Sequence, residues 1–209
     1  MGYQQLRRDI SVEEFDYQVL VTYLDEYANK REKITGLIKS EKIVRVKKGF
    51  YVFGPDYRKG LVCKEALANE LYGPSYISLE YALSFYGLIP ERVETLTSVT
   101  TGANKKFKTP IGAFSYRHLP KDKYCIGYTL TKLDDYHSVL MANPEKALLD
   151  QLYFTKELRG KIKFDEYFFD DLRVDESSLK SLSLTHLEEI TRVFSNSRLT
   201  KAVQFIKEL

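Results

Sequence analysis

The sequence has few of the residues from which catalytic and metal sites are usually built. Of its 209 residues, only three are histidines and two are cysteines. The histidines, His118, His137 and His186, lie in unrelated contexts, outside any HExxH motif or cysteine/histidine cluster. No GxxxxGK[ST] loop is present, and no GxGxxG segment opens a helix. We therefore expect no metal, no cofactor and no bound nucleotide.

Acidic residues are numerous, but they lack the groupings that acid-base or metal-dependent catalysis needs. The close pairs 134–135, 170–171 and 188–189 are sequence neighbours, whose side chains point apart on helices and strands alike. Asp122 followed by Lys123 is the nearest approach to a nuclease motif, which needs carboxylates and a lysine converging at strand ends. We expect no catalytic residues and no enzymatic activity; a nuclease remains the alternative.

Cysteine usage and hydropathy point to a cytoplasmic protein. Cys63 and Cys125 are far apart in sequence and have hydrophobic neighbours, which favours buried free thiols in a reducing compartment. The first ten residues, MGYQQLRRDI, lack the apolar run of a signal peptide. Nowhere do about 18 apolar residues follow one another, as a membrane-spanning helix requires. We expect no membrane partner.

Positive charge is concentrated in one short part of a nearly neutral chain. The whole sequence has a net formal charge of +3, and its 44% hydrophobic content suits one large or two small globular domains. Residues 29–50 hold eight lysines and arginines against two glutamates, a net charge of +6, whereas residues 1–28 carry −4. Such a patch is typical of a nucleic-acid-binding surface, although a lysine-rich face is also a common solvated surface.

The patterning of residues 1–56 predicts a winged helix-turn-helix domain. An amphipathic helix starts at Ser11, and a second helix over residues 30–40 turns its basic side chains outward. Residues 43–53 then alternate as a β-hairpin with a turn at Lys47-Lys48-Gly49, and its apolar side chains complete the core with the two helices. These apolar positions are Val44, Val46, Phe50 and Val52.

This helix and hairpin place cations where a winged helix contacts double-stranded DNA. The second helix of such a domain enters the major groove, and the wing follows the phosphate backbone or reaches a minor groove. Asn29, Arg31 and Thr35, near the helix start, are the candidates for reading base edges, while phosphate contacts supply much of the affinity. The predicted DNA-binding residues are Asn29, Lys30, Arg31, Lys33, Thr35, Lys39, Arg45, Lys47 and Lys48.

Residues 61–209 predict a second domain, so that the fold class is α+β. Helices are expected over residues 61–72 and 78–86, followed by short strands between residues 95 and 141 that form a small, mainly antiparallel sheet. Asn143 and the following proline suit the start of a further helix that packs on this sheet. The C-terminus is helical, and its last helix includes residues 191–209.

A second basic cluster occurs among the predicted strands. Lys105, Lys106 and Lys108 are close together in the segment NKKFKTP. A solvated turn is the simpler explanation, because charged turns are common at sheet edges. The functional alternative is a second surface for DNA or for a protein partner.

Three stretches of the sequence carry a family resemblance. The first is KITGLIK followed by IVRVKKGFY, at residues 33–39 and 43–51. The second is PSYISLEYAL at residues 74–83, leading to YGLIP at residues 86–90. The third and most specific is NPEKALLD at residues 143–150. Together they resemble the AbiEi family, the antitoxins of type IV toxin-antitoxin and phage abortive-infection systems.

The resemblance covers residues 15–155 and implies a function. It implies an N-terminal winged helix that binds inverted repeats at its own promoter and represses its operon. It also implies a C-terminal domain that counteracts a nucleotidyltransferase toxin without forming a stable complex with it. We expect the second and third stretches to define the fold and not an active site, with Ser78 and Asn143 as helix caps.

One departure from the family concerns residues 40–42. The family often has a glycine between the helix and the first wing strand, whereas this chain has Ser40-Glu41-Lys42. A non-glycine residue must then adopt any left-handed conformation there. The leading hypothesis is a non-enzymatic DNA-binding antitoxin and transcriptional autorepressor. The alternatives are a nuclease targeted by the winged helix and an interaction module that binds the toxin directly.

Overall fold

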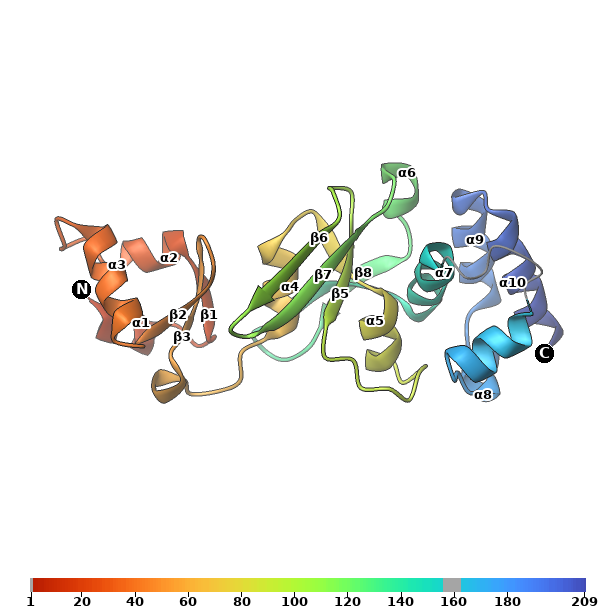
Figure 1. The fold of residues 1–209 in the computed structure, drawn as a ribbon, viewed down its shortest axis with the longest axis horizontal. Helices are drawn as coiled ribbons and strands as arrows, with labels where there is room; N and C mark the ends of the chain where they lie inside the picture. Colours follow the sequence, from red (N-terminus) through yellow and green to blue (C-terminus); the bar gives the residue numbers. More distant parts are fainter. Residues whose placement is uncertain (1, 156–162) are drawn as a thin grey trace.

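The computed structural model describes residues 2–155 and 163–209, and the chain is an α+β protein. Figure 1 shows three parts along its long axis: small helices and a hairpin, a central sheet, and a group of C-terminal helices. We call residues 2–60 the N-terminal unit and residues 61–209 the second domain. None of the helices in the described residues has the length and apolar character needed to cross a membrane.

The N-terminal unit combines three helices with a three-stranded sheet. The strands pair antiparallel in the order β1-β3-β2. The predicted helix over residues 30–40 and the predicted hairpin over residues 43–53 are confirmed. In chain order the elements are α1 (Tyr3–Asp9), β1 (Glu14–Asp16), α2 (Tyr17–Thr22), α3 (Lys30–Lys39), β2 (Ile43–Lys47), β3 (Phe50–Phe53) and the 3₁₀ turn η1 (Pro55–Tyr57).

The first predicted helix is shorter than its apolar spacing indicates. Its first turn forms β1 instead, and Phe15 pairs there with Tyr51 of β3. Asp16 marks the change, because its side chain accepts a hydrogen bond from the backbone N–H of Val19 at 2.7 Å and caps α2. The prediction of a helix from Ser11 was therefore wrong, since pairing with a distant strand overrides the local helical period.

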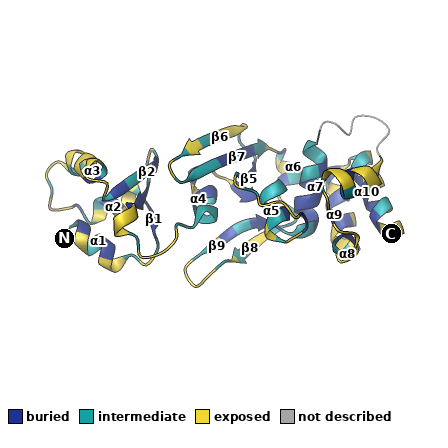
Figure 2. Cartoon of the chain, turned by 60° about the horizontal axis from the view of Figure 1, so that its bottom comes forward, coloured by how far each residue is buried: buried dark blue, intermediate teal, exposed yellow. Residues whose placement is uncertain are grey.

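The β2–β3 hairpin is buried on both faces. It lies between the N-terminal helices and the second domain (Figures 1 and 2). Ile43, Tyr51 and Phe53 on one face pack with α1, α2 and α3. The other face packs against the main core of the second domain and consists of Val44, Val46, Phe50 and Val52. The assignment of these four residues to the core of the N-terminal helices was wrong, because an alternating strand buries either face equally well.

The loops around the hairpin depend on two unusual backbone positions. Glu41, in the loop between α3 and β2, has φ +53°, so a non-glycine residue does adopt the left-handed conformation there. Gly49 in the hairpin turn has φ +91°. Gly54 follows β3, and a Cβ atom on it would lie 1.7 Å from the carbonyl oxygen of Glu41. The end of the hairpin is therefore in close contact with the loop that follows α3.

The second domain is built around a mixed six-stranded sheet. The strand order is β6-β7-β5-β4-β9-β8, with β5–β7 and β4–β9 parallel and the other neighbours antiparallel. Its first elements are α4 (Lys64–Leu71), β4 (Ser75–Ile77), α5 (Leu79–Phe85), β5 (Leu96–Thr100), β6 (Lys105–Thr109) and β7 (Gly112–His118). They are followed by α6 (Lys121–Tyr124), β8 (Tyr128–Lys132), β9 (Ser138–Ala142) and α7 (Pro144–Phe154).

The C-terminal helices cover α7 and not the sheet directly. In Figure 1 they form the far end of the molecule, with α7 between them and the strands. A short π-helical segment (Glu166–Asp171) precedes α8 (Glu176–Lys180), α9 (Leu184–Phe194) and α10 (Ser197–Glu208). The predicted last helix is two helices, because Ser195 has φ +48° and the Asn196 side chain caps α10.

The sheet has one strand more than the sheet predicted. The five strands expected between residues 95 and 141 are present, and three of the five neighbouring pairs are antiparallel, but a sixth strand, β4, lies among them. Strand β4 has only three residues, all buried, so no polar alternation reveals it in the sequence. It lies at the centre of the sheet and joins the two halves.

Candidate nucleic-acid interface

Helix α3 presents a polar stripe to solvent. Asn29 caps the helix by accepting a hydrogen bond from the backbone N–H of Glu32 at 3.1 Å. Ile34 and Leu37 are buried against the N-terminal core, which fixes the rotation of the helix. The opposite, exposed side carries Arg31, Thr35 and Lys39, at the spacing that aligns side chains along one face. Within the described residues, no hydrogen bond or ion pair engages the charged groups of Arg31 and Lys39.

Three of the predicted DNA-binding residues on or beside α3 have intramolecular partners instead. The Lys30 ammonium pairs with Asp25 at 2.5 Å, and the Lys33 ammonium lies 4.4 Å from the ring centroid of Tyr27. The Asn29 side chain is engaged in capping the helix. These contacts stabilise the helix start, so the freely available groups are those of the stripe.

The two lysines at the hairpin turn have different environments. Lys48 is exposed, as is Arg45 on the preceding strand. Lys47 turns toward the second domain, where its ammonium donates to the carbonyl oxygen of Leu71 at 2.5 Å and lies 4.6 Å from the Phe107 ring centroid. Burial, and then the nearby ammonium of Lys105, lower the pKa of Lys47. Lys47 therefore lies in the contact between the two parts, not on the open surface.

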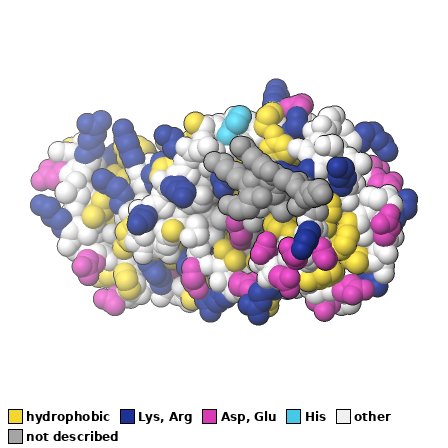
Figure 3. Space-filling model, turned by 45° about the vertical axis from the view of Figure 1, so that its right-hand side comes forward, with side chains coloured by type: hydrophobic (Ala, Val, Ile, Leu, Met, Phe, Trp, Pro, Cys, Tyr) yellow, Lys and Arg dark blue, Asp and Glu magenta, His cyan; other side chains and the backbone are white. Residues whose placement is uncertain are grey.

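Basic side chains predominate at the N-terminal end of the molecule in the view of Figure 3, whereas acidic side chains gather toward the C-terminal helices. We define the α3 surface by the exposed residues that remain after these assignments. It consists of Arg31, Thr35, Lys39, Arg45 and Lys48.

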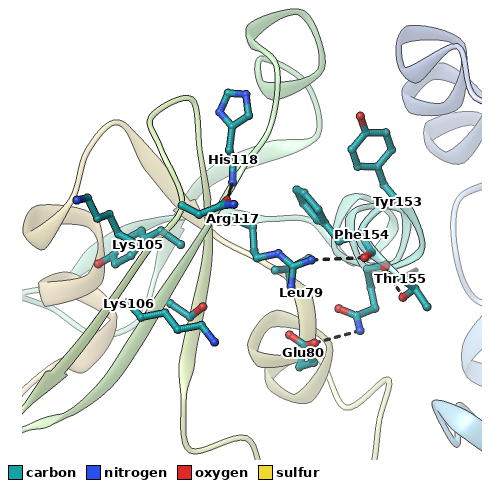
Figure 4. Close-up of a pocket in the computed structure, with 13 residues that line it drawn as sticks. Leu79, Glu80, Lys105, Lys106, Arg117, His118, Tyr153, Phe154 and Thr155 are labelled. Carbon is teal, nitrogen blue, oxygen red and sulfur yellow. Dashed lines mark hydrogen bonds between the residues drawn. The ribbon is translucent and has the colours of Figure 1, made fainter. Parts of the chain in front are cut away.

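The second basic cluster lies on the edge strand β6. Lys105, Lys106 and Lys108 are all exposed, so the cluster is on a strand and not at a turn. Lys105 and Lys106 line a cavity of about 890 Å³ between β6, β7 and α7 (Figure 4). Its other charged lining residues are Glu80 and Arg117.

Two of the charged side chains that line the cavity beside β6 already make intramolecular hydrogen bonds. Arg117 donates to the carbonyl oxygen of Phe154 at 3.4 Å, and its guanidinium carbon lies 4.8 Å from the ring centroid of that residue. Glu80 accepts a hydrogen bond from Gln151 at 3.1 Å (Figure 4). The arrangement offers a weakly basic, polar depression, lined by two lysines and one arginine against one glutamate.

The second and third family-like stretches meet in a buried network. The Asp150 carboxylate accepts hydrogen bonds from Lys146 at 2.7 Å, Tyr76 at 2.9 Å and Ser78 at 2.8 Å. All four residues are 0% exposed, and Lys146 also donates to the carbonyl oxygen of Lys123 at 3.1 Å. Burial lowers the pKa of Lys146, and Asp150 only partly opposes that effect. Because the network is closed to solvent, it serves the fold.

This network changes the role predicted for one cap. Asn143 caps α7 as expected, accepting a hydrogen bond from the backbone N–H of Lys146 at 2.8 Å. Ser78 precedes α5, but its hydroxyl makes no cap and donates to Asp150 instead. The expectation for Ser78 was therefore wrong. A lysine and an aspartate four residues apart, with Ala147, Leu148 and Leu149 between them, were the sequence sign of a buried pair.

The candidate catalytic residues remain apart. Asp122 and Lys123 pair with each other at 2.8 Å near the surface. His118 is exposed, and its Nδ1 lies 2.9 Å from the carbonyl oxygen of Gly102. His137 was expected to be an ordinary histidine, yet its ring lies between Glu14 and Asp134 with a side chain only 11% exposed.

Comparisons with known proteins give a fold relationship without a family. No protein-family model matches the chain, and no curated protein matches its sequence. A solved structure of similar fold is the crystal structure of RV2827C protein from Mycobacterium tuberculosis, with a TM-score of 0.64. The match covers 98% of this chain and 74% of that chain at 16% sequence identity. At this identity the similarity concerns the fold alone.

Proposed function

We propose that this protein binds promoter DNA through a winged helix and acts as the antitoxin and autorepressor of a toxin-antitoxin operon. The observation that carries the proposal is the α3 surface. Its charged groups at Arg31 and Lys39 are exposed and have no hydrogen-bond or ion-pair partner in the part of the chain that the structure describes, on a helix whose other side is fixed in a core. A groove-binding helix needs that combination of rigid placement and free polar groups.

The order of elements supports the winged-helix assignment. The sequence helix, strand, helix, helix and hairpin puts α3 immediately before the two longer strands of the sheet. A recognition helix followed by a wing is the arrangement through which such domains contact a groove and its flanking phosphates. In the proposed complex Arg31 and Thr35 face base edges, while Lys39, Arg45 and Lys48 contact phosphates.

The resemblance to AbiEi antitoxins supports the second part of the proposal. The family-like stretches at residues 74–90 and 143–150 build the centre of the second domain, where Tyr76, Ser78 and Asp150 meet. We propose that this domain counteracts a nucleotidyltransferase toxin encoded beside it. The proposed mechanism needs no catalytic residue and no stable complex with the toxin.

DNA binding is tested by titrating the full-length protein against a fluorescent fragment of its own promoter that contains an inverted repeat. If Lys39, Arg45 and Lys48 contact phosphates, log K should fall with log salt concentration with a slope of about −3 per protomer. The variant R31A/K39A/R45A/K48A should lose specific binding, and the salt dependence of its remaining binding should be much weaker. The matched control R92A/K121A/R192A/K201A removes the same number of exposed arginines and lysines elsewhere.

Equal loss of binding in both quadruple variants would attribute it to net charge and contradict the α3 surface. The antitoxin activity is tested separately, by expressing the neighbouring nucleotidyltransferase with and without this protein. Restored growth is expected with the wild type. Restored growth should persist with the R31A/K39A/R45A/K48A variant when both genes are under foreign promoters, because neutralisation is assigned to the second domain.

A further inference from the structure

Three potential metal ligands converge where the N-terminal unit meets the second domain. Glu14 lies on β1, Cys63 directly precedes α4, and His137 directly precedes β9. A carboxylate oxygen, the sulfur and a ring nitrogen of these residues all lie within 4.8 Å of one another. These segments are distant in sequence, so the fold alone brings the three groups together.

The histidine is already oriented for coordination. Its Nδ1 lies 2.7 Å from Oδ2 of Asp134, and its Nε2 lies 2.6 Å from Oε1 of Glu14. The same Asp134 carboxylate accepts hydrogen bonds from the backbone N–H groups of Tyr136 and His137, which hold it in place. A carboxylate behind a histidine ring is the usual support of a metal ligand, because it fixes both the tautomer and the ring orientation.

The surroundings suit an ion that enters from solvent and is then enclosed. The side chains of Glu14 and His137 are 5% and 11% exposed. Cys63, Asp134 and His137 also line a cavity of about 940 Å³, which gives access to the site. Glu14 is further fixed by the backbone N–H of Cys63, which donates to its Oε2 at 3.2 Å.

We propose that Glu14, Cys63 and His137 bind a zinc ion that joins the N-terminal unit to the second domain. Thiolate, imidazole and carboxylate together form a donor set suited to zinc, whereas magnesium and calcium prefer oxygen ligands alone. With bonds of about 2.0–2.3 Å, tetrahedral ligands lie about 3.5 Å apart. The ion therefore separates His137 Nε2 from Glu14 and draws the sulfur inward. A water completes the coordination. On binding, the Cys63 thiol and the hydrogen bond between His137 Nε2 and Glu14 Oε1 each release one proton to solvent.

Zinc binding is tested on the full-length, reduced protein after a chelator has removed bound metal. Zinc is titrated in competition with a chromophoric chelator, and bound metal is counted by elemental analysis after gel filtration. We expect one zinc per chain. C63S, H137Q and E14Q should each weaken binding by at least about tenfold, since each removes a ligand. C125S and H118Q are the matched controls, because they alter an exposed cysteine and an exposed histidine outside the cluster.

Cobalt(II) gives an independent readout of the same ligands. The cobalt form should show a thiolate-to-metal charge-transfer band that is absent in C63S and present in C125S. D134N should weaken zinc binding while retaining that band, because Asp134 positions the histidine without touching the ion. Circular dichroism of each metal-free variant establishes that it is folded.

Two results would overturn the site. One is the absence of stoichiometric zinc from the wild type, and the other is zinc binding that C63S, H137Q and E14Q all leave intact. Because DNA is absent from these measurements, their outcome is independent of the proposed function.

Discussion

The α3 surface and the network around Asp150 both place charged side chains on helices, but their surroundings are opposite. On α3, Arg31 and Lys39 extend into water without partners among the described residues. On α7, Lys146 and Asp150 are 0% exposed; the Lys146 ammonium donates two hydrogen bonds, and the Asp150 carboxylate accepts three. The charged groups of α3 are exposed and can contact a ligand, whereas those of α7 are bonded to other groups inside the buried network. The same residue type, lysine, is therefore exposed in one region and has a structural role in the other, and only the exposed one can take the binding role proposed above.

The largest expected effect on the free energy of unfolding comes from removing a charge from the buried network around Asp150. Asp150→Ala leaves the Lys146 ammonium buried without its counter-charge, and it should lower the free energy of unfolding by about 3–5 kcal/mol. Lys39→Ala should change it by no more than about 0.5 kcal/mol. Urea unfolding followed by circular dichroism measures both. The double variant K146M/D150L should recover part of the stability lost in D150A, since two buried apolar side chains need no counter-charge. Similar stabilities of D150A and K39A would contradict a closed network.

Tyr76 links the same network to pH. Tyr76→Phe removes a hydrogen bond to a charged acceptor and should cost about 1.5–3 kcal/mol near neutral pH. In the wild type, burial and then Asp150 raise the pKa of Tyr76 well above 10. Its protonation thus contributes stability that is complete below the unfolded pKa of about 10 and is lost as pH rises from there toward the folded pKa.

The matching measurement is the free energy of unfolding from about pH 8 to 11, the range around the unfolded tyrosine pKa. Stability of Y76F should fall less steeply above pH 10 than that of the wild type. Parallel curves for the two proteins would show that the hydroxyl is not responsible for the alkaline loss.

Lys47 and Lys48 allow the same comparison, between a partly buried and an exposed lysine, at two adjacent residues. Lys47→Ala removes a partly buried hydrogen bond to Leu71 and should destabilise the protein by about 1 kcal/mol, with little change in the salt dependence of DNA binding. Lys48→Ala should leave stability unchanged within about 0.5 kcal/mol and reduce the salt slope by about 1. Thermal unfolding and DNA titrations at several salt concentrations distinguish them. The reverse pattern would mean that the hairpin turn contacts DNA through the other lysine.

The smallest expected effect concerns the loop that connects α3 to the hairpin. Glu41 holds a left-handed conformation that costs a non-glycine residue about 1 kcal/mol. Glu41→Gly should therefore raise stability by about 0.5–1 kcal/mol, while Glu41→Ala should not. Differential scanning calorimetry of the two variants measures the difference. Equal thermal unfolding midpoints for the two variants would show that residue 41 leaves the left-handed conformation in solution.

Local patterns predicted much of the fold. Helix α3, the hairpin and the five strands from β5 to β9 each have a period or a turn that the sequence displays over several residues. Two of the misses share one cause, which is contact between distant segments. Pairing of β1 with β3 shortens α2, and β4 is a three-residue strand held by neighbours on both sides. Neither contact leaves a local periodic pattern.

The candidate sites were predictable to a different degree. The basic character of residues 29–50 is visible as composition, but which cations stay free depends on where the hairpin packs. Lys47 and Lys48 are indistinguishable in sequence, and only the second domain separates them. The cluster of Glu14, Cys63 and His137 escaped prediction because motif searches rely on short ligand spacings, and its members come from three remote segments.

The hairpin with two buried faces has a consequence for how this protein can diversify. One face of β3 packs in the N-terminal core and the other in the core of the second domain, so each face is constrained and the N-terminal unit cannot be exchanged as a free module. The exposed stripe of α3 carries no such constraint. Under the proposed function, operator preference can drift through Arg31, Thr35 and Lys39 while the joint between the two halves of the protein stays fixed.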